Sequence, residues 1–200
     1  MSMARTTESR REEAFRSLRS TIKFAAWEPA VRSVLIVDTD RNETSDSAEQ
    51  VARAFAKAGD SCAFVNADFR SGGAGAPGFS DLLLGSLSLD AVLEENAGEG
   101  LLTSIGPGTV ADPDLLAGDQ MTRVLEALVQ RFEFVILSTA CLPAFSDATS
   151  VASRVDATIL VVTSGKTRRA RAIEARDALT RVGARVLGVA LIDTKRRLFW

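Results

Sequence analysis

The chain has 200 residues, of which 46% are hydrophobic and 25% are charged, a composition typical of one globular domain with a sizeable core. Its 24 Lys and Arg residues against 26 Asp and Glu residues give a formal net charge of -2, so no bulk positive field favours nucleic acid as a partner. The chain has no His, which removes the commonest zinc ligand and the usual general base at neutral pH.

Two Cys residues, Cys62 and Cys141, lie in apolar stretches without metal-ligand spacing. We interpret them as reduced core thiols and expect no metal site. No run approaches the roughly 18 apolar residues that span a bilayer, and the charged residues 5–13 lack the apolar core of a signal peptide. The sequence therefore predicts a cytoplasmic protein.

The first predicted element is a helix over residues 7–25. Its apolar stripe consists of Phe15, Leu18, Ile22 and Ala25. On its charged face, Arg16 can pair with Glu12 at i,i+4 and with Glu13 at i,i+3. By itself this pattern indicates a helix that docks on the domain and keeps a solvated charged face.

Apolar and β-branched runs then alternate with segments of helical period. The predicted strands are 33–37, 62–65, 101–105, 134–137, 158–163 and 185–192, and the predicted helices are 48–58, 121–132 and 168–182. The apolar face of the last helix comprises Ala172, Ile173, Ala175, Leu179 and Val182. Continuous apolar strands that alternate with helices predict an α/β fold with a mostly parallel, twisted sheet covered by helices on both faces.

The sequence shows no linker long enough to divide the chain into two globular units. The Gly-rich and Ala-rich stretches at 71–78 and 97–100 are typical of loops. We therefore expect an N-terminal helix, residues 1–30, that forms one globular unit with a domain over residues 31–200.

Residues 13–24 contain the pattern E-x-x-R-x-x-R at Glu13, Arg16 and Arg19. This string resembles the opening helix of the bacterial tyrosine kinases (BY-kinases) of capsule and exopolysaccharide systems. Further pieces resemble that family in order and spacing: 58–59, 66–70, 78–85, 106–107, 112–116, 132–136, 146–147 and 186–189. The resemblance covers nearly the whole chain and implies a P-loop NTPase fold with three nucleotide-binding motifs.

The sequence departs from the first of these motifs, the Gly-rich loop that cradles phosphates and ends in Gly-Lys-Ser/Thr. By the resemblance, Arg41 and Glu43 stand at its glycine positions and Thr44 stands at its lysine. No Gly occurs before residue 59, so a Gly-built cradle after the first strand is impossible. Ser45 matches the magnesium-binding hydroxyl, but a lone Ser at a helix start is more typical of an N-cap.

The other two motifs also differ. The family pattern D-x-D-x-R is matched by Asn66, Asp68 and Arg70, so its first carboxylate is an amide here. Ser138 occupies the position of the carboxylate that ends a later strand and supports the metal. The Asn that contacts the nucleotide base in the family is matched by Asp193.

The chain contains no Tyr, so the family's carboxy-terminal tyrosine cluster cannot be present. Together with the three altered motifs, this absence predicts a pseudokinase with no catalytic residue, no bound cofactor and no metal. We expect such a protein to act as a scaffold or regulator of polysaccharide synthesis and export.

The resemblance implies that the E-x-x-R-x-x-R helix takes part in subunit association. We therefore expect Glu13, Arg16 and Arg19 to lie at an oligomer interface, either between copies of this chain or with an active kinase. A membrane adaptor of the polysaccharide machinery is the other partner that the family implies, and it would recruit the protein to the inner face of the membrane.

Two other functions remain open at this point. A divergent ATP- and Mg²⁺-binding kinase or ATPase would need Arg41, Arg70 or Lys166 to supply the missing cation. A positioning protein related to partitioning ATPases would share the fold, but such proteins use the same phosphate loop. The basic residues 166–171 and 195–197 are more typical of a solvated helix start and tail than of a lipid-binding surface, and the apolar residues 198–200 have no assigned role.

Overall fold

The computed structural model describes residues 2–24, 30–40, 46–70, 75–95 and 100–193, with side chains from Glu12 to Ile192 within those ranges. The strands are β1 (Ser33–Asp38), β2 (Cys62–Asn66), β3 (Glu94–Glu95), β4 (Leu102–Ile105), β5 (Phe134–Ser138), β6 (Ala157–Ser164) and β7 (Val186–Asp193). The helices are α1 (Ser2–Phe24), α2 (Ser47–Ala56), α3 (Phe79–Leu83), α4 (Asp119–Arg131), α5 (Asp147–Ala152) and α6 (Arg169–Arg181), with short 3-10 turns η1 (Leu89–Ala91) and η2 (Pro113–Ala117).

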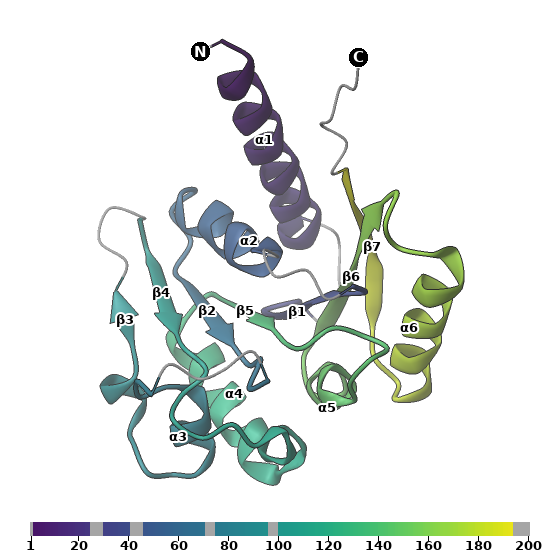
Figure 1. Ribbon diagram of the computed structural model, residues 1–200. Helices are drawn as coiled ribbons and strands as arrows, with labels where there is room; N and C mark the ends of the chain where they lie inside the picture. The colour runs from purple at the N-terminus through teal and green to yellow at the C-terminus, as the bar shows by residue number, and fades with distance from the viewer. Residues whose placement is uncertain (1, 25–29, 41–45, 71–74, 96–99, 194–200) are drawn as a thin grey trace.

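Among the described residues, seven strands form one sheet in the order β3-β4-β2-β5-β1-β6-β7. Every neighbouring pair is parallel except β3 with β4, which is antiparallel. The predicted α/β fold with a mostly parallel sheet and helices on both faces is confirmed (Figure 1).

The sheet separates two hydrophobic cores, because alternate side chains of each strand point to opposite faces. On β1, Leu35 and Val37 face the core that α3, α4, α5 and α6 cover, whereas Val34 and Ile36 face the core under α1 and α2. Burial on both faces explains why β1 is a continuous apolar run in the sequence.

Helix α1 packs on the outer side of α2 and is anchored at its carboxyl end (Figure 1). The side chain of Ile22 is 1% exposed in the core between α1, α2 and the sheet. The next residue, Lys23, forms an ion pair with the buried Asp60, which precedes β2. One apolar and one charged contact therefore fix the same turn of α1.

The structure corrects several predicted boundaries and contacts. Helix α1 begins at Ser2 rather than residue 7, and Ala25 lies outside the described residues. Glu12 contacts Lys57 of the turn after α2 at 3.5 Å, and the predicted Glu13–Arg16 pair is confirmed at 3.0 Å. The N-cap of α2 is Asp46, one residue after Ser45.

At the far end of the chain, the predicted apolar face of α6 is only partly right. Ala175 and Leu179 are fully buried, but Ile173 and Val182 remain 39% and 40% exposed. The strand predicted over residues 101–105 was placed one residue too early at its start, because Leu101 is exposed and β4 starts at Leu102.

Both Cys residues are free and buried, as predicted. Burial, reinforced by the nearby charge of Asp60, raises the pKa of Cys62, so this thiol stays protonated at neutral pH. None of the helices within the described ranges is long and apolar enough to cross a membrane.

Candidate functional site

The carboxyl ends of β1, β2 and β5 meet at one edge of the sheet. Asn66, the last residue of β2, is paired in register with Ser138, the last residue of β5. Ser138 also lies opposite Ile36 of β1, two residues before the strand ends at Asp38. The two positions that differ from the family motifs are therefore direct neighbours in the fold, at the edge where open α/β sheets bind ligands.

The residues after β2 use their side chains to shape the backbone. The Oδ1 of Asn66 accepts a hydrogen bond from the backbone N–H of Asp68 at 3.0 Å. The Oδ1 of Asp68 accepts in turn from the backbone N–H of Arg70 at 3.0 Å. These two consecutive turns hold the chain as it leaves the sheet.

The guanidinium of Arg70 is bound in a bidentate ion pair. Its Nε and one terminal nitrogen donate to the two carboxylate oxygens of Asp147, at 2.7 and 2.9 Å. Asp147 is buried in the first turn of α5, and the ring of Phe145 lies 4.5 Å from the guanidinium carbon. The hydrogen bond to Asp147 raises the pKa of Arg70.

The start of the loop after β1 is tied to the junction between β6 and α6. The Nε of Arg171 donates to the backbone oxygen of Thr39 at 2.6 Å and lies 3.7 Å from a carboxylate oxygen of Asp40. The hydroxyl of Thr167 donates to the same carboxylate and accepts from the backbone N–H of Thr163 at 2.8 Å. The charge of Asp40 is therefore offset by a cation from α6.

Sequence reasoning missed the partners Asp147, Thr167 and Arg171. Asp147 is 77 residues from Arg70, and Thr167 is 127 residues from Asp40. Spacing along the chain carries no signal of such contacts. Of the other residues assigned to the nucleotide motifs, Arg41, Glu43, Thr44 and Ser45 and the side chain of Asp193 lie outside the described residues. Lys166 is exposed in the turn after β6.

A second cluster lies at the same edge, where the chain leaves β4. The carboxylate of Asp81 accepts from the backbone N–H of Gly78 at 2.9 Å and of Thr109 at 3.0 Å, and from the Thr109 hydroxyl at 2.5 Å. Burial alone would raise the pKa of Asp81, but these hydrogen bonds outweigh it and lower the pKa below its usual value. The cluster joins α3 to the loop after β4.

The described residues fit magnesium-bound nucleotide poorly. An amide and a hydroxyl stand where carboxylates would support the metal, and the candidate cation Arg70 already binds a buried carboxylate. Among the residues for which the structure gives a position, no group of three or more His, Cys, Asp or Glu side chains could hold a metal ion.

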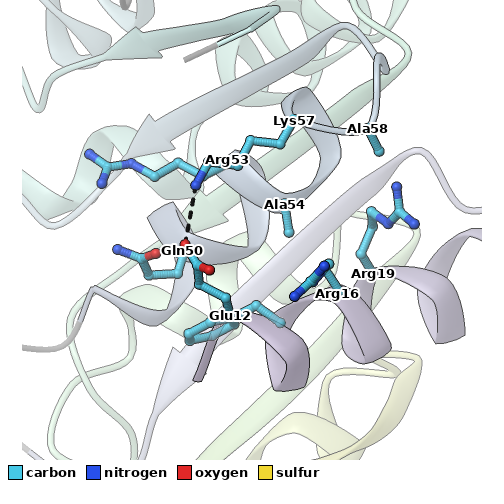
Figure 2. Close-up of a pocket in the computed structure, with 9 residues that line it drawn as sticks. Glu12, Arg16, Arg19, Gln50, Arg53, Ala54, Lys57 and Ala58 are labelled. Atoms are coloured by element: carbon cyan, nitrogen blue, oxygen red, sulfur yellow. Dashed lines mark hydrogen bonds and ion pairs between the residues drawn. The ribbon is translucent and has the colours of Figure 1, made fainter. Parts of the chain in front are cut away.

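The three residues of the predicted oligomer interface lie on α1. Glu13 and Arg16 are exposed on that helix, with 70% and 57% of their side-chain surfaces accessible. Arg19, one turn further on, is half-buried at a pocket between α1 and α2 (Figure 2). Arg16 and Arg19 both line this pocket, whereas Glu13 is not among its lining residues.

The fold is that of the P-loop NTPases, and its neighbours among solved structures are kinase domains. The kinase domain of the Escherichia coli tyrosine kinase ETK superposes with a TM-score of 0.84 and 24% identity, over 94% of this chain and 78% of that one. The BceF tyrosine kinase domain superposes with a TM-score of 0.79 and 25% identity, over 91% of this chain and 77% of that one. More distant neighbours, such as a plasmid partition protein from Borrelia burgdorferi (TM-score 0.61, 14% identity, 84% of this chain, 83% of that one), share the fold.

Curated sequences agree with this class. The chain is 27% identical to the tyrosine-protein kinase YwqD of Bacillus subtilis, over 94% of this chain and 83% of the relative. It is 24% identical to the putative tyrosine-protein kinase CapB of Staphylococcus aureus, over 90% of this chain and 82% of the relative. No protein-family model matches the chain. Over nine-tenths or more of its length, the chain is thus similar to bacterial tyrosine kinases in both sequence and fold.

Proposed function

We propose that this chain is a catalytically inert member of the bacterial tyrosine kinase family that acts through protein contacts. Its task would be to scaffold or regulate a capsule or exopolysaccharide synthesis and export system. The proposal combines the similarity to that family, which spans nearly the whole chain, with the altered chemistry of the nucleotide edge.

The observation that carries the proposal is the neighbouring pair of Asn66 and Ser138 at the ends of β2 and β5. Neither side chain carries a negative charge, so the pair cannot balance Mg²⁺ or accept a proton as two carboxylates would. The sequence adds that no Gly precedes residue 59, which leaves the loop after β1 without the residue type that a phosphate cradle needs.

The alternative of a divergent ATP-dependent kinase has less support. It requires a cation to replace the missing lysine, and two of its three candidates can be located. Arg70 is held by Asp147, and Lys166 lies exposed in the turn after β6. The absence of Gly from the loop after β1 also counts against a positioning ATPase, because such proteins use the same phosphate loop.

Phosphotransfer to an added substrate tests the inert reading. Because the chain has no Tyr, the assay must use an exogenous tyrosine peptide or a second kinase as acceptor, with labelled ATP and Mg²⁺. An active kinase of the family serves as positive control. We expect no transfer above the protein-free background, and transfer by this chain alone would overturn the proposal.

The scaffold reading predicts self-association, or association with an active kinase, through α1. Light scattering of the purified protein, alone and mixed with an active family member, should show an assembly. Replacing Arg16 or Glu13 by Ala should dissolve it, whereas Arg123→Ala, an exposed change on α4, should leave it intact. A monomer under both conditions would contradict the scaffold reading.

A further inference from the structure

A pocket of about 360 Å³ lies between α1 and α2, away from the nucleotide edge (Figure 2). Helix α1 contributes Glu12, Phe15, Arg16 and Arg19. From α2 and the turn after it come Gln50, Arg53, Ala54, Lys57 and Ala58. This volume falls in the range of small-molecule sites, which is about 300–1,000 Å³.

The pocket is a positive site in a protein that carries a net charge of -2. Four of its lining side chains are cationic and one, Glu12, is anionic. Inside the pocket, Glu12 lies 3.5 Å from Lys57 (Figure 2). Two carboxylates beside the pocket pair with two more of its cations, Glu13 with Arg16 at 3.0 Å and Glu49 with Arg53 at 2.7 Å. Even with these two included, cations outnumber carboxylates four to three.

Arg19 is the residue that points to a ligand. Its Nε is buried and has no hydrogen-bond acceptor within the part of the chain that the structure describes. A buried donor without an acceptor is rare in folded proteins and usually marks a site that water, an ion or a ligand completes. Arg19 itself lines the pocket, which is large enough for a ligand.

The form of the pocket narrows the class of that ligand. Guanidinium groups bind phosphate oxygens through paired N–H donors, and a phosphate offers acceptors to cations on both helices at once. Phe15 and Ala54 add an apolar wall beside the charges. We propose that the pocket between α1 and α2 binds a small phosphorylated compound, with Arg19 as its principal contact and Arg16, Arg53 and Lys57 around it.

This inference does not depend on the chain being catalytically inert. The pocket shares Arg16 and Arg19 with the proposed subunit interface, so a bound phosphate would reduce the positive charge of that face. The ligand would then influence assembly, and mass in solution with and without ligand measures that effect.

Calorimetric titration with inorganic pyrophosphate, without Mg²⁺, tests the proposal. It is done at about 50 and about 150 mM salt, because salt screens the attraction between the phosphate and the cations. We expect saturable binding to one site, weakened about tenfold or more by Arg19→Gln. The variant Ala58→Glu keeps Arg19 and places a carboxylate at the pocket mouth, and it should weaken binding as well. Arg169→Gln removes the same charge from the exposed start of α6 and should have no effect.

Two results would overturn the proposal. The first is the absence of saturable pyrophosphate binding. This result includes the case in which Arg19→Gln dissolves an oligomer that pyrophosphate leaves unchanged. An acidic side chain of a second copy would then fill the pocket. The second is binding that survives both pocket variants. A residual nucleotide site at the sheet edge would give that result, and it would appear separately as Mg²⁺-dependent ATP binding in the Arg19→Gln protein.

Discussion

Asp81 shows how one buried carboxylate can hold two segments together. It accepts from the backbone N–H groups of Gly78 and Thr109 and from the Thr109 hydroxyl. An amide keeps the shape of the side chain but loses the charge and one acceptor. Asp81→Asn should therefore destabilise the protein by about 1–3 kcal/mol at neutral pH, as measured by urea unfolding.

The same residue makes a prediction about pH. Because the folded-state pKa of Asp81 is lowered, its contribution is fully present above the unfolded pKa of about 4 and is lost as pH falls through the folded pKa. The difference in unfolding free energy between the wild type and Asp81→Asn should shrink below about pH 4. A difference that stays constant down to that range would contradict this role, and Asp119→Asn, an exposed change, is the control.

Gly78 is required by a close approach of two backbones. A Cβ at this position would lie 2.4 Å from the backbone oxygen of Gly106 and 2.5 Å from the backbone nitrogen of Gly108. Neither atom can move without shifting its loop, so Gly78→Ala should cost about 1–3 kcal/mol in thermal or urea unfolding. At Gly106 an added Cβ meets nothing within 4 Å, so Gly106→Ala should be near neutral. Equal effects of the two changes would show that this contact is wrongly placed.

For individual residues, the sequence predicted which side chains follow the strands but not which side chains they contact. The apolar runs 62–65 and 134–137 predicted that Asn66 and Ser138 follow strands, and the family resemblance assigned these two residues to the nucleotide motifs. The ion pair of Arg70 with Asp147 and the contact of Arg171 with Thr39 could not, since they join segments 77 and 132 residues apart. Gly78 and Asp81 were noted in the sequence only as part of the stretch 78–85 that resembles the family. Their contacts with the loop after β4 were not predicted.

Helix α1 is held on the domain mainly by its last turns. Ile22 is 1% exposed, whereas Phe24, two residues later, is 70% exposed. Ile22→Ala should reduce the free energy of unfolding by about 2–5 kcal/mol and speed hydrogen exchange along α1, because it leaves a cavity beneath the helix. Phe24→Ala, which removes an exposed side chain, should change stability by about 0.5 kcal/mol or less. Equal small effects would mean that α1 does not dock as described.

Long elements were predictable and short ones were not. The strands with five or more apolar or β-branched residues and the helices of ten or more residues appear within a few positions of the predicted bounds. Helix α3, helix α5 and strand β3 were missed, because five, six and two residues are too few to show a period. The predicted apolar face of α6 was too wide, because Ile173 and Val182 are 39% and 40% exposed.

The described residues form an α/β domain with a seven-stranded sheet, and at one edge of that sheet Asn66 and Ser138 differ from the motif residues of the bacterial tyrosine kinases. Each face of the sheet carries a cluster of buried hydrophobic side chains, and Asn66 and Ser138 lie at the ends of strands that contribute to both clusters. The remaining distinctive chemistry is the cationic pocket between α1 and α2 and the exposed motif beside it. These features are the basis of our proposal that the protein works through contacts rather than through phosphotransfer.

The most direct test of this account is calorimetric titration of the purified protein with ATP and Mg²⁺. We predict no binding heat up to millimolar nucleotide. A variant with Arg41→Gly, Glu43→Gly, Thr44→Lys, Asn66→Asp and Ser138→Asp restores the family's motif residues and, if it retains the wild-type thermal unfolding, should gain measurable binding. Micromolar, Mg²⁺-dependent binding by the unaltered protein would contradict the central claim.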